Sequence, residues 1–594
     1  MIRTPLRPLA QVLWARDTGE NPDVIERENI RQRHEEMRGA LRVRAEGRLL
    51  IMSVLFLSLF IVVGARMGML AYSEATEPRA SAAGTAIAAQ RADIVDRQGR
   101  ILATNLETHS LYAQPPHMID KERVADELIK IFPDLDRARL VKDFTGKRKF
   151  LWIKKKISPE QKQAVHDIGD PGLMFGPREM RLYPNGRLAA HVLGGSGFGR
   201  EDVRAAEVIG VAGVEKYFDE ALRDPSNGGK ALTLSLDLTV QAAAERVLYG
   251  GMKLMNAKGA ASILMDVHTG EVISLVSLPD FDPNDRPRPL TEGDQSDSPL
   301  FNRAVQGVYE LGSTFKIFTA AQAMELGLLG PDTVIDTKGP MKVGGHRIGE
   351  FQNKNYGKLS VTDIIVKSSN RGTGRMALNI GPQRQQDFLK SLGLFEATPI
   401  QIVEASGGKP LLPSRWTELS AVTVSYGHGI SSSPMHLAAA YATIANGGRQ
   451  IKPTLLKQSG PQYGPQVVSE RVAAESVRML RKVVTEGTAS FGEVEGYHVA
   501  GKTGTADKPK PTGGYYDDKV INTFASVFPA HDPKYVLIVT LDEPVETSGP
   551  EPRRTAGWTA VPVAAEMIGR IAPLLGLRPE VEPTSLTGIT LTSN

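Results

Sequence analysis

The sequence predicts an α+β protein with one transmembrane helix, an elongated mixed α/β domain, and a domain in which an antiparallel sheet carries a helical layer. Three observations predict this fold class. One long apolar run lies near the N-terminus, short strand and helix signals alternate to about residue 230, and strands, then helices, then strands and a closing helix follow. At 594 residues, 41% hydrophobic and 23% charged, the chain is too long for one domain and too polar for a polytopic membrane protein.

The apolar run is Leu49–Ala65, which carries no charge. As a helix it would rise about 25 Å, close to the hydrocarbon thickness of a bilayer. We therefore predict a transmembrane signal anchor over 49–72, behind a tail over 1–48. The positive-inside rule places this tail in the cytoplasm, because the arginines nearest the run are Arg38, Arg42, Arg44 and Arg48. The tail is too long for the n-region of a cleaved signal peptide, so we expect the anchor to remain.

Small residues dominate 73–90, which predicts a flexible linker. A first folded domain is expected over 91–230. Its segment Arg91–Asn105 alternates apolar and polar residues around a Gln-Gly turn, as a hairpin would. Helices are predicted over Glu122–Phe132 and Ser158–Ile168, the second with Ser158 as N-cap and a proline after it.

A basic cluster in this domain surrounds Phe150 and Trp152 with six lysines and arginines between positions 147 and 156. Such a cluster could bind nucleic acid. We favour a strand over Phe150–Ile153 with solvated charged flanks, because no nucleic-acid motif accompanies it. The net charge of +4 likewise argues against a nucleic-acid partner.

A second folded domain is expected over 231–577, with a disordered tail over 578–594. It opens with a strand, Ala231–Leu236, a helix over Val240–Leu248 and a hairpin over Ala260–Pro279. The apolar periodicity and the glycine stops predict further helices at about 313–327, 361–368, 374–380, 384–392 and 434–446. The chain then returns to strands at Tyr497–Ala500, Thr523–Phe528 and Tyr535–Leu541 before a final helix, Val561–Leu575.

The chain contains no cysteine, and its eleven histidines are scattered without a metal-binding motif. Cysteine nucleophiles, thiolate metal sites and disulfides are therefore excluded. We expect no metal and no cofactor, and catalysis would use hydroxyl, amine, carboxylate or imidazole groups.

Ser313 and Lys316 are the first candidate pair for such chemistry. They open the apolar segment STFKIFTAAQAMELG, and at i and i+3 of a helix they would share one face. A neutral lysine amine beside a serine can take its proton and make the hydroxyl nucleophilic. The same S-x-x-K spacing recurs at Ser406 and Lys409, but in a glycine-rich loop that would not fix the pair.

Two further segments complete a pattern. Ser368 and Asn370 lie at the end of the helix predicted at 361–368, and Lys502, Thr503, Gly504 and Thr505 follow a predicted strand. An acyl-transfer site needs a proton relay, a cation for a carboxylate and backbone N–H groups for an oxyanion. In the order S-x-x-K, S-x-N, K-T-G, the three segments are specific for penicillin-recognising serine acyltransferases.

A rival interpretation exists for the last segment, since Gly496–Thr503 matches the P-loop pattern G-x-x-x-x-G-K-[ST]. A P-loop needs a helix that starts at the lysine. Prolines and glycines after Thr505 disfavour a helix there, so we reject this interpretation.

With these motifs the chain resembles the class B penicillin-binding proteins, and most closely their division branch, from about Arg91 to Leu577. The resemblance is carried by the three motifs and by segments such as RADIVDRQGRILA, RLYPNGRLAAHVLGG, MDVHTGEVISLVSLPDFDPN and NRAVQGVYELGSTFK. It implies a pedestal domain over 91–230 and a β-lactamase-like transpeptidase domain over 231–577. One departure is Leu311, where the family usually has proline.

The resemblance also implies a peptidoglycan D,D-transpeptidase with a serine acyl-enzyme. Ser313 would attack the penultimate D-alanine of a stem peptide, and Lys316 would accept its proton. Ser368 would relay a proton to the leaving D-alanine, while Asn370 orients Lys316. Lys502, Thr503 and Thr505 would face the terminal carboxylate, and the N–H groups of Ser313 and Thr505 would form the oxyanion hole.

The partners that the resemblance implies are peptidoglycan stem peptides of nascent, lipid II-derived glycan, β-lactams, an FtsW-type glycosyltransferase and other division proteins. The implied location is the cell inner membrane, with the catalytic domain in the periplasm. A β-lactamase would need a water-activating group, and a bifunctional class A enzyme would need a glycosyltransferase domain that 91–230 does not resemble. An elongation-type class B transpeptidase and a non-catalytic, peptidoglycan-binding division scaffold remain alternatives.

Overall fold

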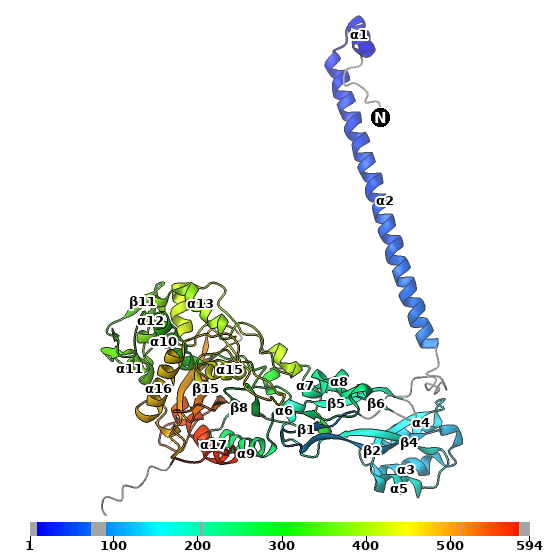
Figure 1. Ribbon diagram of the computed structural model, residues 1–594. Helices are drawn as coiled ribbons and strands as arrows, with labels where there is room; N and C mark the ends of the chain where they lie inside the picture. The colour runs from blue at the N-terminus through cyan, green and yellow to red at the C-terminus, as the bar shows by residue number, and fades with distance from the viewer. Residues whose placement is uncertain (1–8, 73–90, 202–205, 511, 581–594) are drawn as a thin grey trace, which may run out of the picture. The chain divides into compact units, whose positions relative to one another are not determined.

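The computed structural model of the chain describes residues 9–72, 91–201, 206–510 and 512–580. The chain divides into two compact units, Met1–Gly84 and Thr85–Asn594. The predicted linker at 73–90 lies outside the described residues, as does the predicted tail beyond residue 580. Figure 1 labels the helices and strands.

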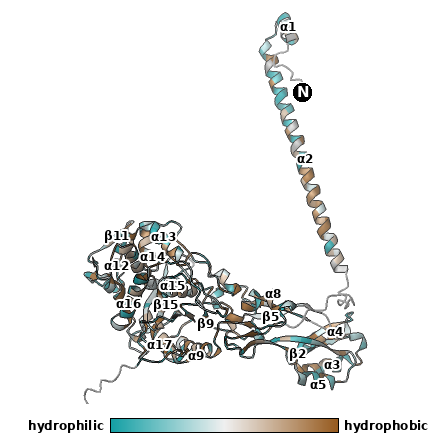
Figure 2. Cartoon of the chain, viewed as in Figure 1, coloured by the Kyte–Doolittle hydropathy of each residue, from teal (hydrophilic) through white to brown (hydrophobic). Residues whose placement is uncertain are grey.

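The first unit consists of two helices, α1 (Leu9–Thr18) and α2 (Pro22–Tyr72). The helix that contains the predicted anchor therefore begins well before residue 49. Figure 2 shows the hydrophobic residues of α2 concentrated in its C-terminal half. Among the described residues, α2 is the one helix long and apolar enough to cross a membrane, and apolar side chains such as Leu57 and Phe60 are uncovered by protein. The chain is thus suited to a membrane anchor.

The first part of the second unit is built on a mixed sheet. Its central strand, β2, pairs antiparallel with β1, β3 and β4, and β1 pairs parallel with β7. The strands are β1 (Ile94–Val95), β2 (Ile101–Ala113), β3 (Leu151–Ile157), β4 (Leu173–Leu182) and β7 (Leu232–Thr233), with a separate hairpin of β5 (Gly195–Glu201) and β6 (Ala206–Ala212). The hairpin predicted around Gln98-Gly99 is formed by β1 and β2.

Short helices accompany this sheet: α3 (Lys121–Ile131), α4 (Arg137–Thr145), α5 (Pro159–His166), α6 (Ala190–Leu193), α7 (Gly213–Tyr217) and α8 (Asp219–Arg223). Ser158 caps α5 in a capping box with Gln161. The first three residues of the basic cluster precede β3, and the strand continues through the other three, of which Lys155 and Lys156 are exposed. This arrangement confirms the interpretation as a strand with solvated charges.

An antiparallel sheet in the order β14-β15-β16-β8-β9 dominates the second part of the unit. Its strands are β8 (Gly259–Asp266), β9 (Val272–Leu278), β14 (Ala500–Pro509), β15 (Tyr515–Phe528) and β16 (Tyr535–Asp542). Helices α9 (Leu238–Leu254) and α17 (Ala560–Leu574) pack together on one side of it, and α15 (Pro434–Ala445) packs on the other (Figure 1). The predicted antiparallel sheet with helices is therefore confirmed.

The remaining helices form a second helical group with α10 (Lys316–Glu325), which packs on α12, α13, α14 and α16. These helices are α11 (Val361–Val366), α12 (Asn370–Ile380), α13 (Pro382–Ser391), α14 (Glu418–Ser425) and α16 (Glu470–Glu486), with small strands at β10 (Val334–Asp336), β11 (Met341–Val343), β12 (His346–Ile348) and β13 (Lys358–Ser360). One hydrophobic core runs from Ile94 through both sheets to Ile571, whereas α3, α4 and the ends of β2 and β3 share a smaller one.

Three sequence predictions in this domain were wrong in detail. Helices α14 and α16 were missed, although α16 buries a full apolar face that includes Val472, Leu480 and Val483. The helix predicted at 361–368 ends at Val366, and the next begins at Asn370 instead of at 374. The strand predicted at 497–500 is displaced, because β14 starts at Ala500 and contains the K-T-G segment itself.

Candidate active site

Ser313 lies in a single 3₁₀ turn, Gly312–Phe315, that leads directly into α10. This turn rests against β14, because a Cβ atom on Gly504 would lie 2.2 Å from the Leu311 carbonyl oxygen. Gly312 adopts a φ of +55°, where side chains other than glycine are strained, and a Cβ there would lie 2.8 Å from the carbonyl oxygen of Thr505. Because these two glycines have no side chains, the backbone of the serine turn packs directly against the backbone of the K-T-G strand.

Leu311, the departure from the family's usual proline, is buried at the start of this turn. Its carbonyl accepts a hydrogen bond of 2.9 Å from the Thr314 hydroxyl, and its φ is −94°. The leucine therefore keeps a tight turn before Ser313 while its side chain fills the core.

Lys316 is fully buried one residue beyond this turn, and its Nζ makes three short contacts. It donates to the carbonyl oxygen of Ser368 at 2.5 Å, to the Ser368 hydroxyl at 3.1 Å and to Asn370 Oδ1 at 2.7 Å. Ser313 is partly exposed, and its hydroxyl has no hydrogen-bond partner among the described residues. The chain thus places a fully buried amine three residues after a serine that is accessible from outside.

Ser368 joins two lysines. It lies between α11 and α12 with a left-handed φ of +59°, a conformation that few residues other than glycine adopt. Lys502, also fully buried, donates from Nζ to the Ser368 hydroxyl at 3.0 Å and to the Thr503 carbonyl at 3.2 Å. One hydroxyl therefore lies within hydrogen-bond distance of the amines of Lys316 and Lys502.

Burial decides the charge of these amines. Removal from water, together with the neighbouring Lys502, holds the pKa of the Lys316 amine well below its usual value. Burial lowers the pKa of Lys502 to about 7. A lysine with a lowered pKa loses its proton at a lower pH, so burial favours the unprotonated amine of Lys316, the form that can act as a base.

The K-T-G-T segment lies in β14, the outer strand of the sheet. The Thr503 hydroxyl contacts the Thr488 hydroxyl at 2.7 Å, and the Thr505 hydroxyl accepts a hydrogen bond of 2.9 Å from the Ala556 N–H. Because β14 is an edge strand, alternate backbone N–H groups point away from β15 and can donate hydrogen bonds to a ligand.

Glu350 is a residue of the site that the sequence did not reveal. Its buried carboxylate accepts hydrogen bonds from the Ser369 hydroxyl at 2.6 Å and from the N–H groups of Asn370 and Arg371 at 2.8 and 3.0 Å. It therefore satisfies the first N–H groups of α12 and fixes Asn370, which contacts Lys316. No motif surrounds Glu350, so only the fold could identify it.

His428 pairs with Glu310, which lies three residues before Ser313. Its Nδ1 lies 3.2 Å from Glu310 Oε2, while Glu310 Oε1 accepts from the Gly429 N–H at 2.8 Å and from the Tyr515 hydroxyl at 2.9 Å. These contacts tie the start of β15 to the segment that leads into Ser313.

The two rival motifs fit the fold poorly. Ser406 of the second S-x-x-K is exposed in a short 3₁₀ helix, Val403–Gly407, and donates to the Val403 carbonyl. Lys502 of the P-loop pattern lies inside an antiparallel strand, paired with Ala525, and no helix starts there. The structure thus brings Ser313, Lys316, Ser368, Asn370 and Lys502–Thr505 together at one place.

Comparison with known proteins identifies the family. The model of the penicillin-binding protein transpeptidase domain matches residues 260–567, just over half of the chain. The chain belongs to the penicillin-binding protein transpeptidases. The model of the penicillin-binding protein dimerisation domain matches residues 86–235, in agreement with the pedestal that the sequence predicted. The resemblance stated from the motifs is therefore confirmed.

Named relatives of this penicillin-binding protein point to the division branch. It is 32% identical to the probable peptidoglycan D,D-transpeptidase FtsI of Caulobacter vibrioides, over 92% of each chain. It is 27% identical to the peptidoglycan D,D-transpeptidase FtsI of Escherichia coli K12, over 84% of this chain and 86% of that protein. A crystal structure of Mycobacterium tuberculosis penicillin-binding protein 3 with aztreonam matches with a TM-score of 0.62 and 25% identity, over 83% of this chain and 98% of that one.

Proposed function

We propose that this chain is the peptidoglycan D,D-transpeptidase of septal cell-wall synthesis and that Ser313 is its nucleophile. The observation that carries the proposal is the convergence of two buried lysine amines on the Ser368 hydroxyl, with Lys316 one helical turn from an accessible serine. The FtsI names of relatives that align over most of the chain support the role in division.

In the acylation step, Ser313 Oγ attacks the carbonyl carbon of the penultimate D-alanine of a stem peptide. Its proton passes to the unprotonated Lys316 amine, a form that the lowered pKa favours. The N–H groups of Ser313 and Thr505 stabilise the oxyanion that develops. The close contact of the serine turn with β14 supports this pairing.

The tetrahedral intermediate then breaks its C–N bond and releases D-alanine. The leaving amine needs a proton, and the contacts Lys316–Ser368–Lys502 supply a relay through the Ser368 hydroxyl. Lys502, together with the hydroxyls of Thr503 and Thr505, binds the terminal carboxylate. An amine of a neighbouring stem attacks the acyl-enzyme in turn, and the cross-link forms as Ser313 regains its proton.

β-Lactams acylate the same serine, because their ring amide and carboxylate resemble the D-Ala-D-Ala ending. Neither a cofactor nor a metal takes part in these steps. A non-catalytic division scaffold would not need two buried lysines, and burying them costs folding free energy, which a catalytic role explains. The elongation branch is the remaining alternative, and cellular location separates it from division.

The topology proposed for the chain is a cytoplasmic tail over 1–48, an inner-membrane anchor over 49–72 and a periplasmic remainder, with a linker over 73–90, a pedestal over 91–230, a transpeptidase domain over 231–577 and a tail over 578–594. The arginines before the apolar half of α2 support this direction. An FtsW-type glycosyltransferase would supply nascent glycan from lipid II, and other division proteins would hold the pair at the septum.

A tagged copy tests the cellular role. We expect fluorescence at midcell during constriction, and a lateral pattern would assign the chain to elongation.

The purified protein should also keep its penicilloyl adduct for many minutes, because no water-activating group is expected at the ester. Turnover within seconds would instead indicate a β-lactamase.

The pH dependence of acylation tests the lysine assignments. With benzylpenicillin, the second-order rate constant should fall as the pH rises through about 7, because free Lys502 then loses the charge that binds the carboxylate. In Lys502→Arg this alkaline fall should vanish, since a guanidinium stays protonated. Lys508→Arg, on the same strand but paired with Asp542, is the control and should keep the fall. A flat wild-type profile, or the same fall in Lys502→Arg, would contradict the assignment.

A further inference from the structure

Two histidines from separate loops meet at one end of the catalytic sheet. His498 lies just before β14, and His531 lies in the turn between β15 and β16. The Ala530 N–H donates to the His498 carbonyl at 2.8 Å, and the two ring centroids are 5.4 Å apart. The loops are thus held together by their backbones, independently of the imidazoles.

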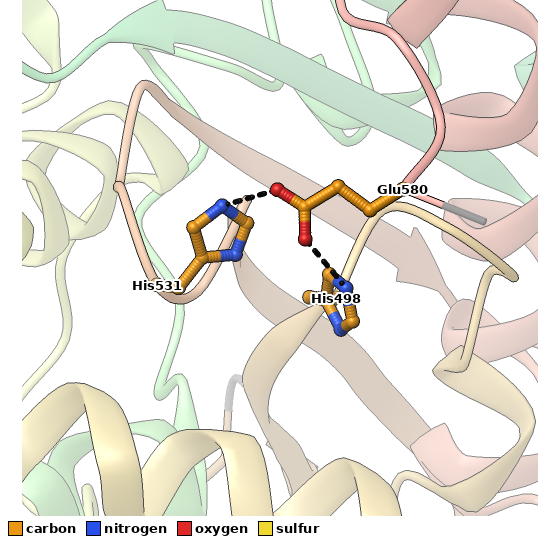
Figure 3. A group of neighbouring side chains, drawn as sticks. All are labelled: His498, His531 and Glu580. Carbon is orange, nitrogen blue, oxygen red and sulfur yellow. Dashed lines mark ion pairs between the residues drawn. The ribbon is translucent and has the colours of Figure 1, made fainter. Parts of the chain in front are cut away.

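A carboxylate completes the group. Glu580 Oε2 lies 3.1 Å from His498 Nε2, and Glu580 Oε1 lies 2.9 Å from His531 Nε2. Figure 3 shows Glu580 reaching between the two rings. The three donor atoms all lie within 4.8 Å of one another. One carboxylate therefore faces two imidazole nitrogens.

The backbone brings Glu580 to this place. After α17 the chain returns to the loop before β14, where the Glu580 N–H donates to the Gly496 carbonyl at 2.9 Å. Gly496 has a φ of +80°, and a Cβ there would lie 2.6 Å from Pro579. The close fit of Pro579 on this glycine positions the carboxylate without help from the histidines.

We infer that His498, His531 and Glu580 form a binding site for a divalent transition-metal ion, with zinc as the ion that suits them. Two neutral imidazoles and one carboxylate are a donor set that zinc uses, with a fourth position left to water. Tetrahedral zinc with ligands at about 2.0–2.2 Å separates them by about 3.3 Å. The three donor atoms lie within 4.8 Å of one another, so side-chain rotations can bring them onto one ion.

Charge and access agree with an ion here. With neutral imidazoles the group carries one negative charge, which a cation neutralises. The side chains are 38%, 49% and 58% exposed in the order His498, His531 and Glu580, so an ion can enter and keep a water ligand. The sequence predicted no metal site because His498, His531 and Glu580 form no contiguous motif.

A bound ion would connect the segment after α17 to the loop before β14 and to the turn between β15 and β16. Lys502 lies in β14, four residues after His498. The ion would therefore restrain the N-terminal end of the strand to which the proposed substrate binds. Zinc binding at these three residues does not depend on whether the chain is a transpeptidase.

Zinc titration of the full chain in detergent, after removal of metal with a chelator, tests the inference. We expect one equivalent of zinc to bind per chain with micromolar or tighter affinity. His498→Ala, His531→Ala and Glu580→Gln should each weaken binding at least about tenfold. His166→Ala, which removes an exposed histidine of α5, is the matched control and should bind zinc as the wild type does.

Two spectroscopic readouts separate a metal site from a cluster of ion pairs. Cobalt(II) should give the strong visible absorption of a tetrahedral site in the wild type and lose it in Glu580→Gln. Zinc should also slow hydrogen exchange at the Glu580 amide. Glu580→Gln keeps the backbone contacts, so loss of folding cannot explain a negative result, and cooperative thermal unfolding verifies this. Absence of stoichiometric zinc, or equal zinc affinity in the three variants and the wild type, would overturn the inference.

Discussion

Replacing Ser313 with alanine is expected to abolish covalent labelling by fluorescent penicillin and all transpeptidation. The hydroxyl is the proposed nucleophile, and without it no acyl-enzyme can form. The protein should remain folded, because Ser313 is partly exposed and its hydroxyl has no hydrogen-bond partner among the described residues. We expect its stability to change by less than about 0.5 kcal/mol. Gel fluorescence of the labelled protein and thermal unfolding measure the two effects.

Ser406→Ala is the matched control for this experiment. Ser406 belongs to the second S-x-x-K of the chain, but it lies exposed in a short 3₁₀ helix. This variant should label at the wild-type rate. Normal labelling of Ser313→Ala would refute the proposed mechanism, as would loss of labelling in Ser406→Ala with the protein folded.

Replacing Lys316 with alanine is expected to slow acylation by about 10²- to 10⁴-fold, the usual contribution of a positioned general base. Its amine is fully buried, and burial together with Lys502 lowers the pKa of the amine, which favours the unprotonated form that can accept the serine proton. Stopped-flow measurement with a chromogenic or fluorescent β-lactam gives the rate. Mass spectrometry after long incubation should still find the slow adduct on Ser313.

Lys409→Ala serves as the control, because this exposed lysine belongs to the second S-x-x-K. It should acylate at the wild-type rate. A Lys316→Ala protein that is folded and acylates within tenfold of the wild type would assign the base to another group, with Ser368 and Lys502 as the next to test.

Local motifs were the most predictable part of the site. Ser313 and Lys316 are three residues apart at the start of a helix, and helix geometry alone places such residues on one face. The capped helix α5 and the antiparallel pair β8–β9 were predictable for the same reason, since caps, turns and alternation act between near neighbours.

Elements that depend on long-range packing were predicted less well. Helix α16 was missed although its apolar residues recur at helical spacing, and its burial depends on β14, α10 and α11. Lys502 was placed after the strand predicted at 497–500. It lies inside β14 because β15 supplies paired hydrogen bonds from Ala500 to Asp507.

The sequence by itself determined the apolar helix suited to a membrane anchor, the fold class, the family and the residue types of the candidate site, because these depend on composition and on short spacings. Only the tertiary structure decided which groups meet. Lys316 contacts Ser368 across 52 residues, and Lys502 reaches the same hydroxyl across 134. The lowered pKa values of both lysines, the role of Glu350 at α12 and the meeting of His498 with His531 and Glu580 arise from that convergence. Burial and distance exist only once the chain is folded.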